Sequence, residues 1–123
     1  MPAQETVVVL GASPDPERYS HKAMQLLEAH HHEVVPVSPV YREIDGQAVH
    51  ASLAGVGKPV DTLTLYLSPK RLVPLTDEIV ALRPGRVIFN PGTESPELQS
   101  ALDAAGIPWL EACTLVMLRT QQF

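Results

Sequence analysis

The chain has 123 residues, 45% of them hydrophobic, and a formal net charge of −5. This length predicts a single domain over residues 1–123 with one hydrophobic core, and the acidic balance argues against a nucleic-acid partner. The apolar runs are too short for a transmembrane helix, so no membrane partner is expected, and residues 1–5 lack the pattern of a secretion signal. The single cysteine, Cys113, excludes an internal disulfide and suits a reducing compartment, so we expect a cytoplasmic protein.

The first elements in the chain are a strand, a helix and a second strand. Thr6–Leu10 is an unbroken run, TVVVL, that Gly11 ends, which is typical of a parallel strand buried on both faces. A helix is expected from Ser20 to His30, with Ser20 as its N-cap. The second strand is expected at Glu33–Val37, although Pro36 is unusual inside a central strand.

An irregular stretch follows, and then a third strand and a second helix. Residues 38–59 carry no clear periodicity, with a turn expected at Asp45-Gly46. Asp61–Leu67 predicts the third strand. The second helix is expected to begin near Pro74, because proline is tolerated in the first turn of a helix.

The last third of the chain predicts two more strands. Arg86–Asn90 forms the fourth strand and Glu94–Ala105 the third helix, which Gly106 ends. Ile107–Leu110 forms the fifth strand, and Thr114–Leu118 a short closing turn or helix.

Alternating strands and helices predict an α/β domain in three layers, a Rossmann-like fold with helices on both faces of a parallel sheet. We expect five strands in the order 3-2-1-4-5. Ligands of such sheets bind outside the carboxyl ends of the strands, where the winding reverses. In this order the reversal lies between the first and fourth strands.

The strongest local signal is Gly11-Ala12-Ser13 between the first strand and its helix. Free amides at a helix N-terminus bind anions, and glycine lets a phosphate approach the backbone. The alternative is an ordinary turn in which Gly11 merely avoids a clash. The G-x-G-x-x-G fingerprint is absent, and Val37-Ser38-Pro39 offers no carboxylate for the ribose of NAD.

Several segments of the chain together match a known family. They are VVVLGASPDPERYS (7–20), VVPVSP (34–39), EIDG (43–46), SL (52–53), VDTLTLYLSP (60–69) and NPGTE (90–94). In them the chain resembles the stand-alone CoA-binding-domain family, which is similar to the N-terminal domain of the succinyl-CoA synthetase α subunit. It departs from the family at Ser38, where Asn is common, at Asn90-Pro91, and at His30–His32, where a glycine is expected.

The resemblance implies a site for coenzyme A or an acyl-CoA. The pyrophosphate would meet Gly11, Ala12, Ser13 and the amides near Tyr19 and Ser20, while the 3′-phosphate would meet Arg42. Ser38 and Pro39 would flank the nucleotide, with Tyr66, Leu67 and Ser68 on the adenine or ribose side and Asn90, Gly92 and Thr93 opposite. Arg18 is either part of this site or a surface charge.

No catalytic residue and no metal site stand out. Cys113 has no basic neighbour in the sequence and is expected to be a small buried residue. His30–His32 is expected to be a solvated helix end, because consecutive side chains rarely share one ion. The favoured function is a non-catalytic carrier, sensor or partner of an acyl-CoA enzyme, and a homodimer is possible. The alternatives are an NAD(P)-binding oxidoreductase-like protein and a protein-interaction module with a lapsed pocket.

Overall fold

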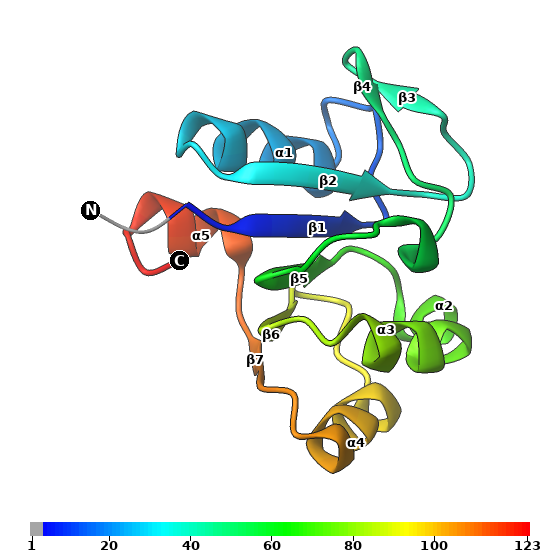
Figure 1. Ribbon diagram of the computed structural model, residues 1–123. Helices are drawn as coiled ribbons and strands as arrows, with labels where there is room; N and C mark the ends of the chain where they lie inside the picture. Colours follow the sequence, from blue (N-terminus) through cyan, green and yellow to red (C-terminus); the bar gives the residue numbers. More distant parts are fainter. Residues whose placement is uncertain (1–3) are drawn as a thin grey trace.

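The computed structural model describes residues 4–123 and has a five-stranded parallel sheet between helices (Figure 1). This confirms the α/β, Rossmann-like fold in three layers. The strands, in spatial order β2-β1-β5-β6-β7, are Glu33–Val37, Thr6–Leu10, Thr62–Leu65, Arg86–Phe89 and Trp109–Glu111.

The expected strand order was wrong. Counted along the chain, the five strands lie in the order 2-1-3-4-5, because β5 pairs with β1 on the side opposite β2. Val8 shows this directly, since it is in register with Val35 of β2 and with Leu63 of β5. The winding therefore reverses between β1 and β5, and not between the first and fourth strands.

Pro36 fits this corrected order. Strand β2 is an edge strand, and the Pro36 carbonyl accepts from the His50 amide at 3.1 Å on the side away from β1. The ring nitrogen of Pro36 faces the same way, because a residue in a strand directs both backbone polar groups to one side. No hydrogen bond to β1 is lost, which is why proline is tolerated here.

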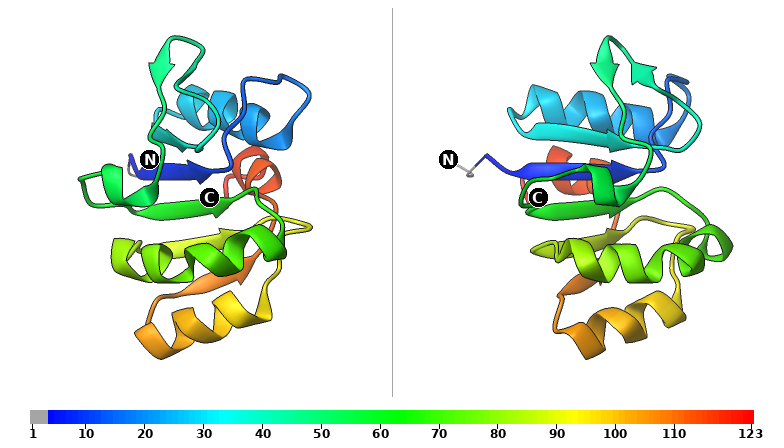
Figure 2. Two further views of the ribbon diagram at one scale, coloured as in Figure 1. Left: turned by 90° about the vertical axis from the view of Figure 1, so that its right-hand side faces the viewer. Right: turned by 45° about the vertical axis from the view of Figure 1, so that its right-hand side comes forward.

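The helices cover the two faces of the sheet (Figure 2). One face carries α1 (Tyr19–Ala29) and α5 (Thr114–Arg119), which pack with Val7 and Val9. The other face, with Val8 and Leu10, carries the remaining helical elements. These are η1 (Leu53–Gly55), α2 (Pro69–Leu72), η2 (Val73–Leu75), α3 (Thr76–Leu82) and α4 (Pro96–Ala105).

Two expected helix starts were displaced. Helix α1 begins at Tyr19 with Arg18 in the cap position, so the buried Ser20 is not its N-cap. The second helical region begins at Pro69, and Pro74 falls inside the short η2 turn. Helix α4 ends at Ala105 as expected, and the Ser95 hydroxyl before its first residue, Pro96, accepts from the Leu98 amide.

The stretch after β2 contains a hairpin of β3 (Glu43–Ile44) and β4 (Gln47–Ala48). Its turn is the expected Asp45-Gly46, with φ of 51° and 80°. Positive φ at both central positions is the geometry of a type I′ hairpin turn. Ile44 is 1% exposed and fixes the hairpin on the core.

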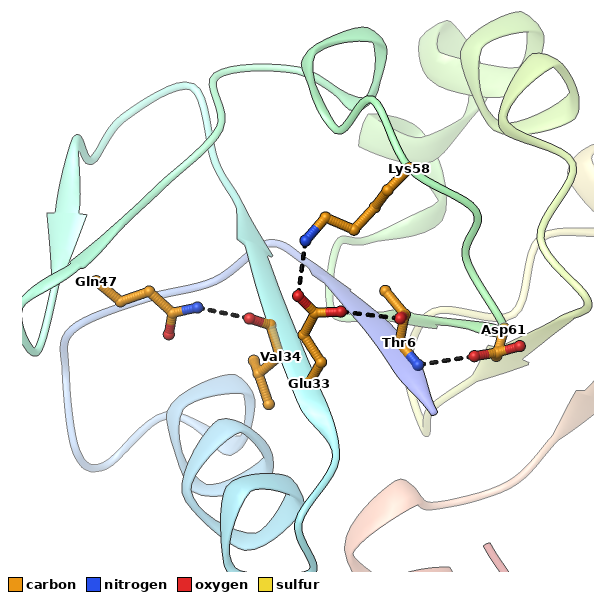
Figure 3. A network of polar contacts seen from close by, with 6 residues as sticks. All are labelled: Thr6, Glu33, Val34, Gln47, Lys58 and Asp61. Atoms are coloured by element: carbon orange, nitrogen blue, oxygen red, sulfur yellow. Dashed lines mark hydrogen bonds and ion pairs between the residues drawn. The ribbon is translucent and has the colours of Figure 1, made fainter. Parts of the chain in front are cut away.

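The amino ends of the strands are joined by polar contacts (Figure 3). Glu33 accepts from Lys58 Nζ at 2.6 Å and from Thr6 Oγ1 at 3.0 Å. The Thr6 amide donates to Asp61 Oδ2 at 2.8 Å, and Gln47 Nε2 donates to the Val34 carbonyl at 2.5 Å. This cluster lies at the end of the sheet opposite the expected ligand site, so it serves the fold.

His30–His32 were expected to be a solvated helix end, and this is wrong for His32. His31 adopts φ of 67° in place of a glycine, and it is exposed together with His30. His32 is instead buried, its Nδ1 accepts from the Glu5 amide at 3.0 Å, and its ring lies against Phe123. No helix within residues 4–123 is long and apolar enough to cross a membrane.

Candidate functional site

The carboxyl ends of the parallel strands meet at one edge of the sheet, and two cavities open there. Gly11 follows β1, Ser38 follows β2, Tyr66 follows β5 and Asn90 follows β6. These segments are the ones in which the sequence places a ligand. Of these four residues, Gly11 lines the first cavity described next, and Tyr66 and Asn90 line the second.

The first cavity has a volume of about 260 Å³ and lies over the ends of β1, β2 and β5. Four leucines give it apolar walls, and Gly11, Pro39 and Ser52 also line it. Two charged residues, Arg71 and Glu78, also line it. Its full lining is Leu10, Gly11, Val37, Pro39, Ala51, Ser52, Leu53, Leu67, Arg71, Leu75 and Glu78.

The second cavity, of about 210 Å³, lies on the side of α1 and α5. It collects two aromatic rings, an amide and a thiol from separate elements. Its lining residues are Tyr19, Tyr66, Asn90, Pro91, Cys113 and Leu115. Cys113 is half-buried here, where the sequence predicted a buried position.

Gly11 is required by packing against β5. It has φ of 94°, and a Cβ atom at this position would lie 3.1 Å from the backbone of Tyr66. The amides of Gly11 and Ala12 both donate to the Val37 carbonyl, at 3.0 and 3.2 Å. These two amides are therefore not free to bind a phosphate, contrary to the prediction for the Gly11-Ala12-Ser13 turn.

The free amides lie slightly further along the chain. Those of Ser13, Tyr19, Ser20 and His21 donate to no acceptor within residues 4–123. Helix α1 has no side-chain cap and no acidic residue in its first turn. The first turn of α1 therefore has unpaired amides and no carboxylate of its own, which favours the binding of an anion at a helix start.

From the sequence, His21 at the start of the first helix could either touch the ligand or be a surface residue, and the structure shows that it is not on the surface. It is 4% exposed, and its Nε2 lies 2.6 Å from Asp45 Oδ2. Its Nδ1 is buried and has no partner within the described residues. The contact joins the start of α1 to the hairpin turn, and because it spans 24 residues no local pattern reveals it.

Asn90 lines the second cavity, but its side-chain amide is committed to the fold. Its Nδ2 donates to Thr64 Oγ1 at 2.7 Å and to the Leu65 carbonyl at 2.8 Å. Its Oδ1 accepts from the Thr114 amide at 2.8 Å, at the start of α5. Both of its donor hydrogens are therefore used inside the protein.

Other expected site residues also have internal partners. The Ser38 hydroxyl is buried and accepts from the Val40 amide at 3.1 Å. The Thr93 hydroxyl donates to the Asn90 carbonyl at 2.8 Å, whereas Gly92 is exposed. These contacts shape the loops, and they leave backbone groups and apolar surfaces as the parts open to a ligand.

Tyr66 is an apolar and hydrogen-bonding wall of the second cavity, and not a base. Burial raises the pKa of its hydroxyl to about 12, so the phenol stays protonated at neutral pH. Residues 4–123 contain no cluster of three or more His, Cys, Asp or Glu side chains that could hold a metal ion.

The cations expected at the site are exposed and lie outside both cavities. Arg18 occupies the N-cap position of α1 and Arg42 precedes β3, but neither lines either cavity. Arg71, which the sequence did not single out, does line the first one. Arg71 was missed because the start of this helix was expected near Pro74, whereas α2 begins at Pro69.

A doubly wound parallel sheet with helices on both faces (Figure 2) defines a Rossmann-like α/β domain. The chain belongs to the CoA binding domain family, whose profile matches residues 5–119.

Solved structures and a curated relative agree with this fold. The chain superposes on the crystal structure of an uncharacterized protein with a TM-score of 0.93 and 39% identity, covering 99% of this chain and 100% of that one. A Thermus thermophilus structure, cell-free ID.343, gives a TM-score of 0.89 and 35% identity over 98% and 91% of the two chains. YneT of Bacillus subtilis (strain 168) is 26% identical over 60% of this chain and 55% of its own length. That match thus spans little more than half of YneT.

Proposed function

We propose that this protein binds coenzyme A or an acyl-CoA at the carboxyl edge of its sheet, with residues 5–119 acting as one binding unit. Membership of the CoA binding domain family supports a CoA ligand in general. The observation that carries the placement is the set of free amides at Tyr19, Ser20 and His21, in a helix start without an acidic residue. A pyrophosphate is the part of CoA that such a start would hold.

The two cavities suit the other parts of the CoA molecule. The 260 Å³ cavity, with its leucine walls beside Gly11, suits the adenosine end. The 210 Å³ cavity, between Tyr19 and Tyr66, suits the pantetheine arm or a short acyl group. In this arrangement the amides at the start of α1 would hold the pyrophosphate, which joins these two ends of CoA.

The same features support a binding role without catalysis. The Tyr66 hydroxyl stays protonated, and the Asn90 amide is committed to internal bonds. A carrier, a sensor or a partner of an acyl-CoA enzyme would need only the binding surface. At the end of β2, Ser38 and Pro39 offer no carboxylate to a ribose, which favours CoA over NAD.

Tyr19→Pro tests the amide site, with Tyr19→Ala as its matched control. Tyr19 is the first residue of α1, and the preceding Arg18 is already extended at φ −77° and ψ 140°. Proline is tolerated at such a position, so the variant removes one N–H without breaking the helix. Calorimetric titration with CoA, acetyl-CoA and NAD measures the effect.

We expect CoA and acetyl-CoA to bind the unaltered protein and NAD to bind far more weakly. Tyr19→Pro should weaken CoA binding about tenfold beyond Tyr19→Ala, the value of one charge-assisted hydrogen bond. An absence of heat with every CoA species at millimolar concentration would overturn the proposed function. Equal affinities of the two variants would overturn the placement of the pyrophosphate at α1.

A further inference from the structure

We propose that Arg71 binds the phosphate monoester on the ribose of the nucleotide and so distinguishes CoA from dephospho-CoA. This inference rests on the proposed function and adds the residue that sets its specificity. The observation that supports it is that Arg71, a cation on α2, lines the same cavity as Gly11 and Pro39. Helix α2 follows directly from the carboxyl end of β5 (Figure 1).

Arg71 is a cation free to serve a ligand. It is exposed, it lines the 260 Å³ cavity, and it forms no ion pair within residues 4–123. Leu75 lies one helical turn further on and lines the same cavity. The cavity therefore combines an apolar wall with a guanidinium group at its margin, which suits a purine nucleoside that carries a phosphate.

The distribution of charge within CoA indicates that Arg71 meets its adenosine end. If the pyrophosphate lies on the amides of Tyr19 to His21, the adenosine lies beyond it toward the leucine walls. The remaining charge at that end is the ribose phosphate, a monoester of about −1.5 to −2 at neutral pH. A guanidinium group binds such a monoester through two parallel hydrogen bonds.

The other charged residues considered for this role fit it less well. Arg42 is exposed but lines neither cavity, and Lys58 is held by Glu33 at 2.6 Å at the opposite end of the sheet. Glu78 lines the same cavity two turns after Arg71. The Glu78 carboxylate would repel a phosphate beside it, so the phosphate is expected on the part of the cavity wall that Arg71 forms.

Titration of Arg71→Ala with CoA and with dephospho-CoA tests the inference. Lys70→Ala is the matched control, because Lys70 is an exposed cation on the same helix that does not line the cavity. Arg42→Ala tests the competing cation. Thermal unfolding of each variant, followed by circular dichroism, confirms that it is folded.

We expect Arg71→Ala to weaken CoA binding about ten- to hundredfold while leaving dephospho-CoA binding unchanged within about twofold. Lys70→Ala and Arg42→Ala should change the ratio of the two affinities by less than about twofold. The inference is overturned if Arg71→Ala lowers both affinities equally, or if Arg42→Ala removes the preference instead. Failure of the unaltered protein to bind either ligand would instead count against the proposed function.

Discussion

His21 Nε2 lies 2.6 Å from Asp45 Oδ2, and this one contact fastens the start of α1 to the turn of the β3–β4 hairpin. The imidazole is buried, whereas the Asp45 side chain is 60% exposed. The acceptor can therefore be altered without opening the core. The contact sits beside the free amides of α1, so it contributes to the shape of the candidate phosphate site.

Asp45→Gly should destabilise the protein by about 1–3 kcal/mol, the cost of leaving a buried polar group without its partner. Glycine accepts the φ of 51° at this position, so the loss reports the side chain and not the backbone. Urea unfolding measures it. Asp45→Asn, which keeps an acceptor oxygen and tolerates positive φ, is the control, and a Gly variant as stable as the Asn variant would contradict the prediction.

Gly11 and Gly92 provide a matched pair for the close approach of β1 to β5. Their φ angles are 94° and 92°, but only at Gly11 would a Cβ atom meet neighbours, the nearest being Leu67 Cδ2 at 3.0 Å. Gly11→Ala and Gly92→Ala share the cost of a positive φ. We expect Gly11→Ala to lose about 1–3 kcal/mol more, as overpacked sites do.

The comparison is made by urea unfolding of both variants under the same conditions. Equal losses of unfolding free energy would contradict the prediction, because they would show that Tyr66 and Leu67 move away from the new Cβ atom without an energetic cost. A larger loss at Gly11, with an unchanged dependence of the unfolding free energy on urea, would confirm that the turn after β1 is fixed by contact with β5.

His32 should make stability depend on pH. Burial lowers the pKa of His32 from its usual value of 6.5, so the folded state favours the neutral ring. The unfolded chain then binds the proton more readily. The contribution of His32 to stability is complete above pH 6.5 and is lost as the pH falls below this value toward the lowered pKa. Protonation of Nδ1 would also remove the acceptor of the Glu5 amide.

Unfolding free energies between pH 5 and 8 test this dependence. His32→Asn should flatten it, because an Asn oxygen can replace Nδ1 as acceptor without titrating. His30→Asn, at an exposed neighbour, should leave the slope unchanged. A slope that persists in His32→Asn would assign the pH dependence to another group.

Local patterns were sufficient for most of the elements but not for their order in space. The run Thr6–Leu10 and the Asp45-Gly46 turn are local signals, and both were confirmed. The strand order depends on which side of β1 receives β5, which no single segment encodes. Pro36 was the one local hint, because a proline in β2 favours an edge position, and β2 is the edge strand.

The sequence predicted the candidate site as a region, but it could not predict the internal bonds that its residues form. The carboxyl edge follows from the alternation of strands and helices. In contrast, the bonds of Asn90 to Thr64 and Thr114 reach across 26 and 24 residues, so no local pattern reveals that the side-chain amide of this expected site residue has internal partners. The Val37 carbonyl likewise occupies the amide of Gly11, which only the pairing of β1 with β2 reveals.

The outer edge of strand β2 is protected against pairing with a strand of another molecule. Val34, Pro36 and Ser38 direct their outward polar groups to residues 47–50, through the Gln47 side chain and the His50 backbone. A strand of another molecule cannot add to this border while those bonds persist, and proline offers no donor to it. Growth of the sheet by strand addition must therefore start from Trp109–Glu111 at the opposite border, which is a short template for aggregation.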